Sequence, residues 1–177
     1  MKKKVRNIVL WLAGFLLVLG IIFGVGYLFH CSLRAKSCVE LRNEVARYSN
    51  YSEQEVAIAI YALAKPYLTA TEVRSFAARL GELQKDPIGG TDEYEQLTFD
   101  ICSAANAVDI PENTRELIRK LYDARVDVGA CAWDIYYDPK AIKAELSHEE
   151  LVQKRREFAN LQQDMDDLLA KYDEKTK

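Results

Sequence analysis

The sequence predicts an all-α protein in which a single N-terminal transmembrane helix continues into an antiparallel helical bundle of about five or six helices. Two observations lead to this prediction. Residues 8–29 contain no charged side chain, and the remainder of the 177-residue chain places apolar residues three and four positions apart, as amphipathic helices do. Only eight glycines and four prolines interrupt the chain. This composition favours helices that are joined by short loops.

Residues 8–30 are expected to form an uncleaved signal-anchor helix. The uncharged run spans about 33 Å as a helix, which is enough to cross the hydrocarbon core of a bilayer. It is longer than the core of a cleaved signal peptide, which has roughly 7–15 residues. Residues 1–7 form a short basic tail with four Lys and Arg side chains, which the positive-inside rule places in the cytoplasm. We therefore expect a bacterial inner-membrane protein whose helical domain is periplasmic.

Gly20 and Gly24 have the G-x-x-x-G spacing that lets two helix backbones approach closely in lipid. They are a candidate transmembrane dimer seam. The alternative is a lone anchor that contains small residues, because glycine is common in membrane helices.

Charge divides the chain at the end of the anchor. Residues 1–30 hold four basic and no acidic side chains, so residues 31–177 hold 20 basic and 27 acidic ones, a net charge of −7. An acidic domain of this kind argues against a nucleic-acid partner, which would require a basic face.

Helix boundaries in the domain, residues 31–173, follow from turn and capping signals. Three capping boxes are expected, at Ser52/Glu55, Thr69/Glu72 and Ser147/Glu150. Loops are expected at 86–91 and 109–111, where proline or glycine interrupts the pattern, and residues 174–177 are expected to be a frayed tail. The predicted helices cover residues 31–48, 53–68, 69–85, 92–108, 112–137, 140–146 and 148–173.

The four cysteines admit two interpretations. If the helices alternate up and down from the membrane, Cys38 and Cys102 lie at similar heights, which makes them the candidate disulfide of an exported domain. Alternatively, the cysteines are free thiols that pack as small hydrophobic side chains.

Two groups of apolar residues are candidate contact surfaces. Trp133, Tyr136 and Tyr137 share one edge of a helix and form either a recognition patch or, as the favoured interpretation, part of the core. The C-terminal helix repeats apolar residues over about three heptads, either as a coiled-coil face for another chain or as the last core-facing helix. The residues of this face are Leu151, Phe158, Leu161, Met165, Leu168 and Tyr172.

No catalytic, cofactor-binding or metal-binding constellation is predicted. The only two histidines are His30, at the membrane border, and His148, in the first turn of an exposed helix, so neither is matched to a nucleophile. The cysteines lack the short spacing of structural zinc sites. We therefore expect a scaffold or accessory subunit, not an enzyme. Its partners would be the bilayer and other membrane or envelope proteins, a second copy of the chain included.

Two alternatives remain. The first is a membrane-tethered inhibitor or immunity-type protein whose acidic face binds a basic extracytoplasmic partner. The second is an envelope enzyme whose cleft is built from residues that carry no recognisable motif.

Overall fold

The computed structural model describes residues 2–85 and 91–177, with side chains for residues 11–48, 52–85 and 92–177. Over these residues the chain is all-helical, with six α-helices, one 3-10 turn and no β-strand. Apart from Thr91, the loop expected at 86–91 lies outside the described residues. The elements are α1 (Lys2–Ala64), η1 (Lys65–Tyr67), α2 (Ala70–Leu83), α3 (Thr91–Asn106), α4 (Glu112–Tyr137), α5 (Pro139–Ile142) and α6 (His148–Thr176).

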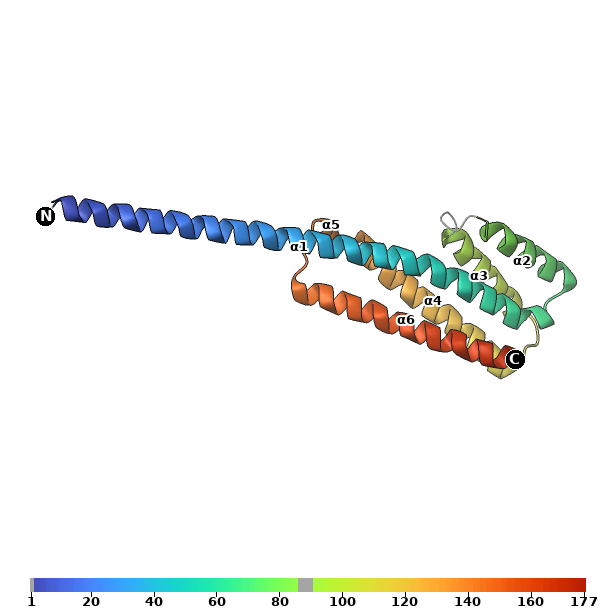
Figure 1. Ribbon diagram of the computed structural model, residues 1–177. Helices are drawn as coiled ribbons and strands as arrows, with labels where there is room; N and C mark the ends of the chain where they lie inside the picture. The colour runs from blue at the N-terminus through green and yellow to red at the C-terminus, as the bar shows by residue number, and fades with distance from the viewer. Residues whose placement is uncertain (1, 86–90) are drawn as a thin grey trace.

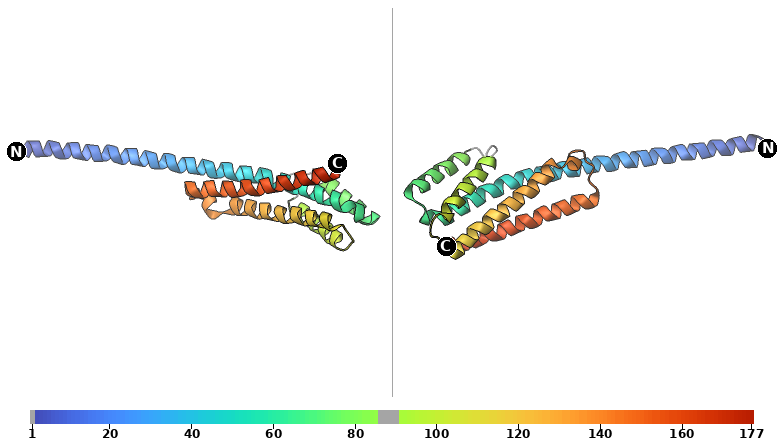
Figure 2. Two further views of the ribbon diagram at one scale, coloured as in Figure 1. Left: turned by 90° about the horizontal axis from the view of Figure 1, so that it is seen from below. Right: turned by 180° about the vertical axis from the view of Figure 1, so that it is seen from behind.

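The molecule consists of a group of packed helices from which the first half of α1 protrudes (Figures 1 and 2). The second half of α1 packs against α3, α4 and α6. In Figure 1, α3 and α6 run in the same direction as α1, whereas α4 runs back toward the protruding end. We call residues 31–177 the helical domain. The short α5 and the start of α6 form its end nearest the protruding part of α1.

The core of the helical domain lies between α1, α3, α4 and α6. Each helix contributes one apolar face, spaced at three and four residues, as the sequence predicts. Burying a large aliphatic side chain stabilises a fold by about 1.5–3 kcal/mol, so these faces hold the helices together. The largest fully buried side chains include Leu41 and Ile60 of α1, Leu97 and Ile101 of α3, Leu121 and Ile135 of α4, and Met165 of α6.

The helix break expected at residues 49–52 is absent, because α1 is continuous through this segment. Ser52 does not act as an N-cap. Its hydroxyl is buried and lies 3.1 Å from Nε2 of Gln162 on α6, which donates a hydrogen bond to it. Polar residues reduce helix propensity by only about half a kcal/mol each. Packing of the helix on both sides of the segment, at Val45 and Val56, therefore outweighs the local signal.

Two of the predicted capping boxes are confirmed. Thr69 accepts a hydrogen bond from the backbone N–H of Glu72, and the Glu72 carboxylate accepts one from the backbone N–H of Thr69 at 2.8 Å. Ser147 and Glu150 form the same reciprocal pair at the start of α6. These hydrogen bonds lower the pKa of both carboxyls, that of Glu150 to about 2. Each box marks the point at which the chain reverses direction.

The other boundaries shift by a few residues. The helix expected to end at residue 68 ends at Ala64, since Pro66 lies in the 3-10 turn that follows. At the other end of the chain, α6 includes residues up to Thr176, so most of the segment expected to be a frayed tail is helical.

Replacing Ser147 with alanine is expected to lower the free energy of unfolding by about 1 kcal/mol, because the first turn of α6 loses its capping hydroxyl. Urea unfolding of the full chain in a non-ionic detergent, followed by far-UV circular dichroism, measures this change. Ser75→Ala is the matched control, since Ser75 is exposed inside α2 and caps no helix. Equal stability of the two variants would contradict the prediction.

Candidate interaction surface

The aromatic residues Trp133, Tyr136 and Tyr137 lie on the surface of α4. Trp133 is 63% exposed and Tyr137 is 50% exposed, so the favoured interpretation of these residues as core is wrong. Their rings contact one another, with centroids 4.1 Å apart for Trp133 and Tyr137 and 5.0 Å apart for Tyr136 and Tyr137. The buried face of α4 at this level consists of Ala132 and Ile135. The helix therefore turns the aromatic edge outward.

The exposed aromatic residues continue along α4 as an apolar stripe. Val126, Ala130, Trp133 and Tyr137 are all exposed and are spaced by four, three and four residues. This spacing is that of the seam through which two helices pack side by side. We call these four residues the α4 stripe. It extends over about 16 Å of the helix.

A contact between α1 and α4 fixes the height of the stripe above the protruding part of α1. The guanidinium group of Arg42 lies 4.5 Å from the ring centroid of Tyr136, a distance at which a cation is attracted to an aromatic ring. Arg42 is twelve residues beyond His30, which corresponds to about 18 Å along the helix. The aromatic end of the stripe therefore lies beside α1, about 18 Å from the end of the apolar segment.

The heptad face of the C-terminal helix packs within the chain. Leu151, Phe158 and Met165 are buried, and Leu161, Leu168 and Tyr172 are half-buried against the same core. α6 uses this face to contact α4 and α1. α6 is therefore the last core-facing helix of the chain, and its heptad face is not available as a coiled-coil surface for another chain.

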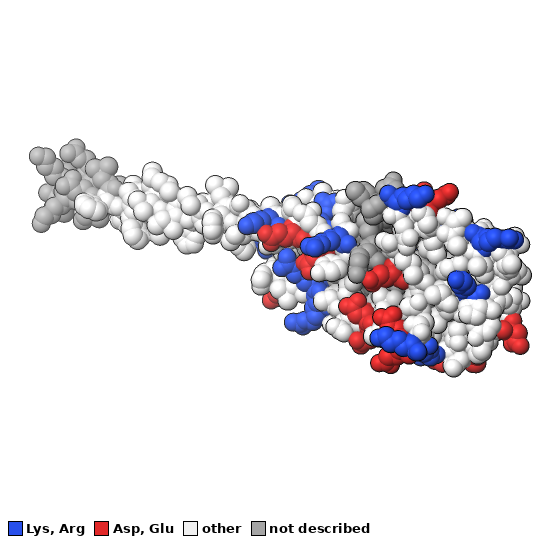
Figure 3. Space-filling model, turned by 45° about the vertical axis from the view of Figure 1, so that its right-hand side comes forward, with Lys and Arg blue, Asp and Glu red and all other residues white. Residues whose placement is uncertain are grey.

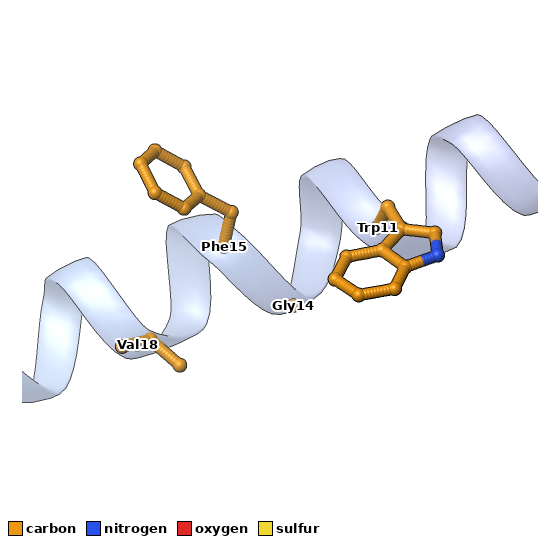
Figure 4. A pocket seen from close by; sticks show the side chains of 4 residues that line it. All are labelled: Trp11, Gly14, Phe15 and Val18. Atoms are coloured by element: carbon orange, nitrogen blue, oxygen red, sulfur yellow. The ribbon is translucent and has the colours of Figure 1, made fainter.

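Gly20 and Gly24 lie on the protruding part of α1. A side chain added at either position would meet no atom within 4 Å, so neither glycine packs against another described residue. Nearer the N-terminus, Gly14 leaves a shallow gap on the helix between Trp11, Phe15 and Val18 (Figure 4). The gap is lined almost wholly by apolar atoms and contains no group suited to chemistry.

All four cysteines are free, and the structure does not bring the predicted pair together. Cys102 follows Glu95 on α3, which runs in the same direction as α1 and not back toward the protruding part of α1 (Figure 1). Glu53 of α1 and Glu95 of α3 both contact Arg125, so they lie at the same position along the axis of the helical domain. Cys38 precedes Glu53 and Cys102 follows Glu95, so the two cysteines are about 33 Å apart along this axis. Burial raises the pKa of the Cys102 thiol to about 11. Cys38, Cys102 and Cys131 pack in or against the core, which matches the alternative interpretation of the cysteines as packed thiols.

A buried ionic cluster joins α1, α3 and α4. Arg125 of α4 is only 3% exposed, and its guanidinium lies 3.6 Å from Glu53 Oε1 and 3.7 Å from Glu95 Oε1. The ring of Tyr122 lies 5.2 Å from the same guanidinium. Among the described residues, Glu53 Oε2 and Arg125 Nε have no hydrogen-bond partner. Desolvation of the Glu53 carboxyl outweighs the attraction of Arg125 and raises its pKa to about 7.

Sequence reasoning did not identify this cluster. Arg125 lies in the middle of the apolar pattern of α4, four residues after Leu121 and three before Val128. The signal in the sequence is the charge of Arg125 at a core position of an otherwise regular apolar pattern. Glu53 lies in the first turn of the helix predicted for residues 53–68, where the helix dipole favours an acidic side chain without any buried partner.

The described residues offer no cluster of three His, Cys, Asp or Glu side chains that could hold a metal ion. The chain matches no protein-family model, no curated protein and no solved structure.

Proposed function

We propose that the protein is a scaffold or accessory subunit of a bacterial envelope complex and binds a partner protein through the α4 stripe. In this proposal residues 8–30 span the inner membrane, and the helices of residues 31–173 form an antiparallel bundle on its periplasmic side. The observation that carries the proposal is the exposed stripe. Contiguous apolar surface with large aromatic residues marks interaction sites in folded proteins.

The protruding part of α1 supports the membrane anchor. By length and composition it is the one helix among the described residues that is suited to cross a membrane, and no side chain in its most apolar stretch is buried. In Figure 3, the surface of the protruding part between the residues drawn in grey and the helical domain shows no Lys, Arg, Asp or Glu side chain. Because α1 continues into the domain without a break, the anchor would hold the stripe at a fixed height.

This height favours a protein partner over the lipid surface. The aromatic end of the stripe lies about 18 Å beyond the apolar segment, whereas the headgroup region adds only about 5–8 Å on each side of the hydrocarbon core. Trp133 and Tyr137 are therefore above the lipid headgroups. A partner that is anchored in the same membrane would meet them from the side.

The side of α1 on which Gly20 and Gly24 lie favours a partner that differs from this chain. Gly20 and Gly24 are each 18 residues, or about five turns, before Cys38 and Arg42. Cys38 is buried in the domain and Arg42 contacts Tyr136, so the glycines lie on the side of α1 that carries the domain. A parallel two-fold dimer through this face would force two domains into the same space. A membrane helix without such a domain has no such conflict.

Photo-crosslinking in intact membranes tests the proposed function. Val126 in the stripe and Val152 on α6 are both 41% exposed, which makes them matched positions for a photoreactive amino acid. We expect a discrete crosslinked species of higher mass from position 126 and none from position 152. Identical products from both positions, or no product from position 126, would overturn the proposal.

A second candidate function is the inhibitor or immunity-type protein, which the charge distribution favours. Residues 31–48 and 131–158, at the membrane end of the domain, hold nine basic and eight acidic side chains, whereas the rest of the domain holds 11 basic and 19 acidic ones. An acidic outer end attracts a basic soluble partner. Such a complex would dissociate at high salt, whereas a contact through the apolar stripe would persist.

A further inference from the structure

The exposed face of α4 extends beyond the stripe into a groove between α3 and α4. Arg119 and Tyr122 precede Val126 at spacings of three and four residues, so one face of α4 runs for about 27 Å from Arg119 to Tyr137. The groove has a volume of about 250 Å³. It is lined by Phe99, Cys102, Ser103 and Asn106 of α3 and by Arg115, Ile118, Arg119 and Tyr122 of α4.

The two helices that line the groove, α3 and α4, both pack against α1 and contact each other less extensively. Its α3 side presents Phe99, which is exposed, and the half-buried thiol of Cys102. Its α4 side presents Tyr122 and the buried Ile118. Phe99, Ile118 and Tyr122 give each side an apolar part, which leaves room for one large apolar side chain, and the rest of the lining is polar (Ser103, Asn106, Arg115 and Arg119). The groove thus supplies a pocket at the outer end of a face that is otherwise flat.

Acidic residues follow one side of this face. Asp123, Asp127 and Asp134 are exposed, and none of them forms an ion pair with another residue that the structure describes. They are four and seven residues apart, which places them along one flank of the helix. We call these three residues the acidic edge. An apolar seam with charges along its flank is the arrangement that selects partner helices in coiled coils.

We infer that the α4 face binds an amphipathic helix whose apolar seam is flanked by Lys or Arg. The inference rests on the proposed function and specifies the partner. The seam of that helix would pack on the α4 stripe, one large apolar side chain would enter the groove, and the basic residues would meet the acidic edge. Complementary flanking charges contribute mainly specificity and rate of association, whereas the apolar contacts supply the affinity.

Peptide binding to the full chain tests this inference. The probe is a fluorescent 21-residue helical peptide with leucine at seam positions and lysine on the flanks, and its twin has glutamate in place of lysine. The protein is held in nanodiscs of zwitterionic phosphatidylcholine, and empty nanodiscs control for lipid binding. We expect the lysine peptide to bind at least about tenfold more tightly than the glutamate peptide, as judged by fluorescence anisotropy.

Two sets of variants separate the apolar from the charged contribution. Val126→Asp is expected to weaken binding of the lysine peptide by about tenfold or more, whereas the matched control Val152→Asp leaves it unchanged. Lysine at all three positions of the acidic edge (Asp123→Lys, Asp127→Lys and Asp134→Lys) is expected to reverse the preference between the peptides. Circular dichroism confirms that each variant remains folded.

The outcomes distinguish this inference from the proposed function. If position 126 crosslinks to a partner but the charge reversal leaves the peptide preference unchanged, the basic helix is overturned and the interaction surface stands. If position 126 yields no crosslink either, both fail. Crosslinking of position 126 to a second copy of this chain would also overturn the inferred partner.

Discussion

Acidification from pH 8 to pH 5 is expected to raise the free energy of unfolding by about 2–3 kcal/mol, because Glu53 binds its proton more tightly in the folded protein than in the unfolded chain. Burial raises the Glu53 pKa from 4.5 to about 7. The stabilisation that comes from protonated Glu53 is therefore complete below about pH 4.5 and is lost as the pH rises through about 7. Urea unfolding of the full chain in detergent, repeated between pH 5 and pH 8, measures the slope.

Two variants test whether the cluster of Glu53, Glu95 and Arg125 causes this dependence of the free energy of unfolding on pH. Glu53→Gln removes the titrating group and is expected to flatten the dependence between pH 5 and pH 8. Arg125→Met removes the positive charge that lowers the Glu53 pKa, so the loss of stability should extend to higher pH. A slope that persists unchanged in Glu53→Gln would show that another group causes it. Below about pH 4, protonation of carboxyls whose pKa is lowered, such as Asp100 beside Arg79, opposes the gain.

Truncation of Leu121 to alanine is expected to lower the free energy of unfolding by about 2–5 kcal/mol, because it removes buried methyl groups and leaves a cavity. Leu121 is fully buried at the centre of α4. The same urea experiment measures the loss. Leu33→Ala is the control, since Leu33 is half exposed on α1, and its effect is expected to stay within about 0.5 kcal/mol.

Comparison of Leu121→Ala with Val126→Asp distinguishes the buried face of α4 from its exposed face. Leu121→Ala should lower stability, whereas Val126→Asp should weaken binding and leave stability unchanged within about 0.5 kcal/mol. A loss of stability in Val126→Asp as large as that in Leu121→Ala would contradict the assignment of the stripe to the surface.

The all-helical class and most helix boundaries were predictable from the sequence because they depend on short-range signals. α4 begins after Pro111 and ends before Asp138 and Pro139, as predicted, since proline restricts the backbone wherever the rest of the chain lies. The capping boxes at Thr69 and Ser147 are equally local, because each needs only residues three positions apart. The apolar segment of α1 was also evident from composition.

Tertiary packing decided the features on which the functional argument depends. The continuity of α1 through Ser52, the exposure of Trp133 and Tyr137, and the burial of Arg125 each depend on neighbours that are distant in sequence. The direction of α3 separated Cys38 from Cys102 and brought Glu95 to Arg125. A helical pattern identifies an apolar face, but the side chains at its edges are buried or exposed according to which helices pack beside them. The physical reason is that local hydrogen bonds define where helices begin and end, whereas contacts between helices define which edges remain free.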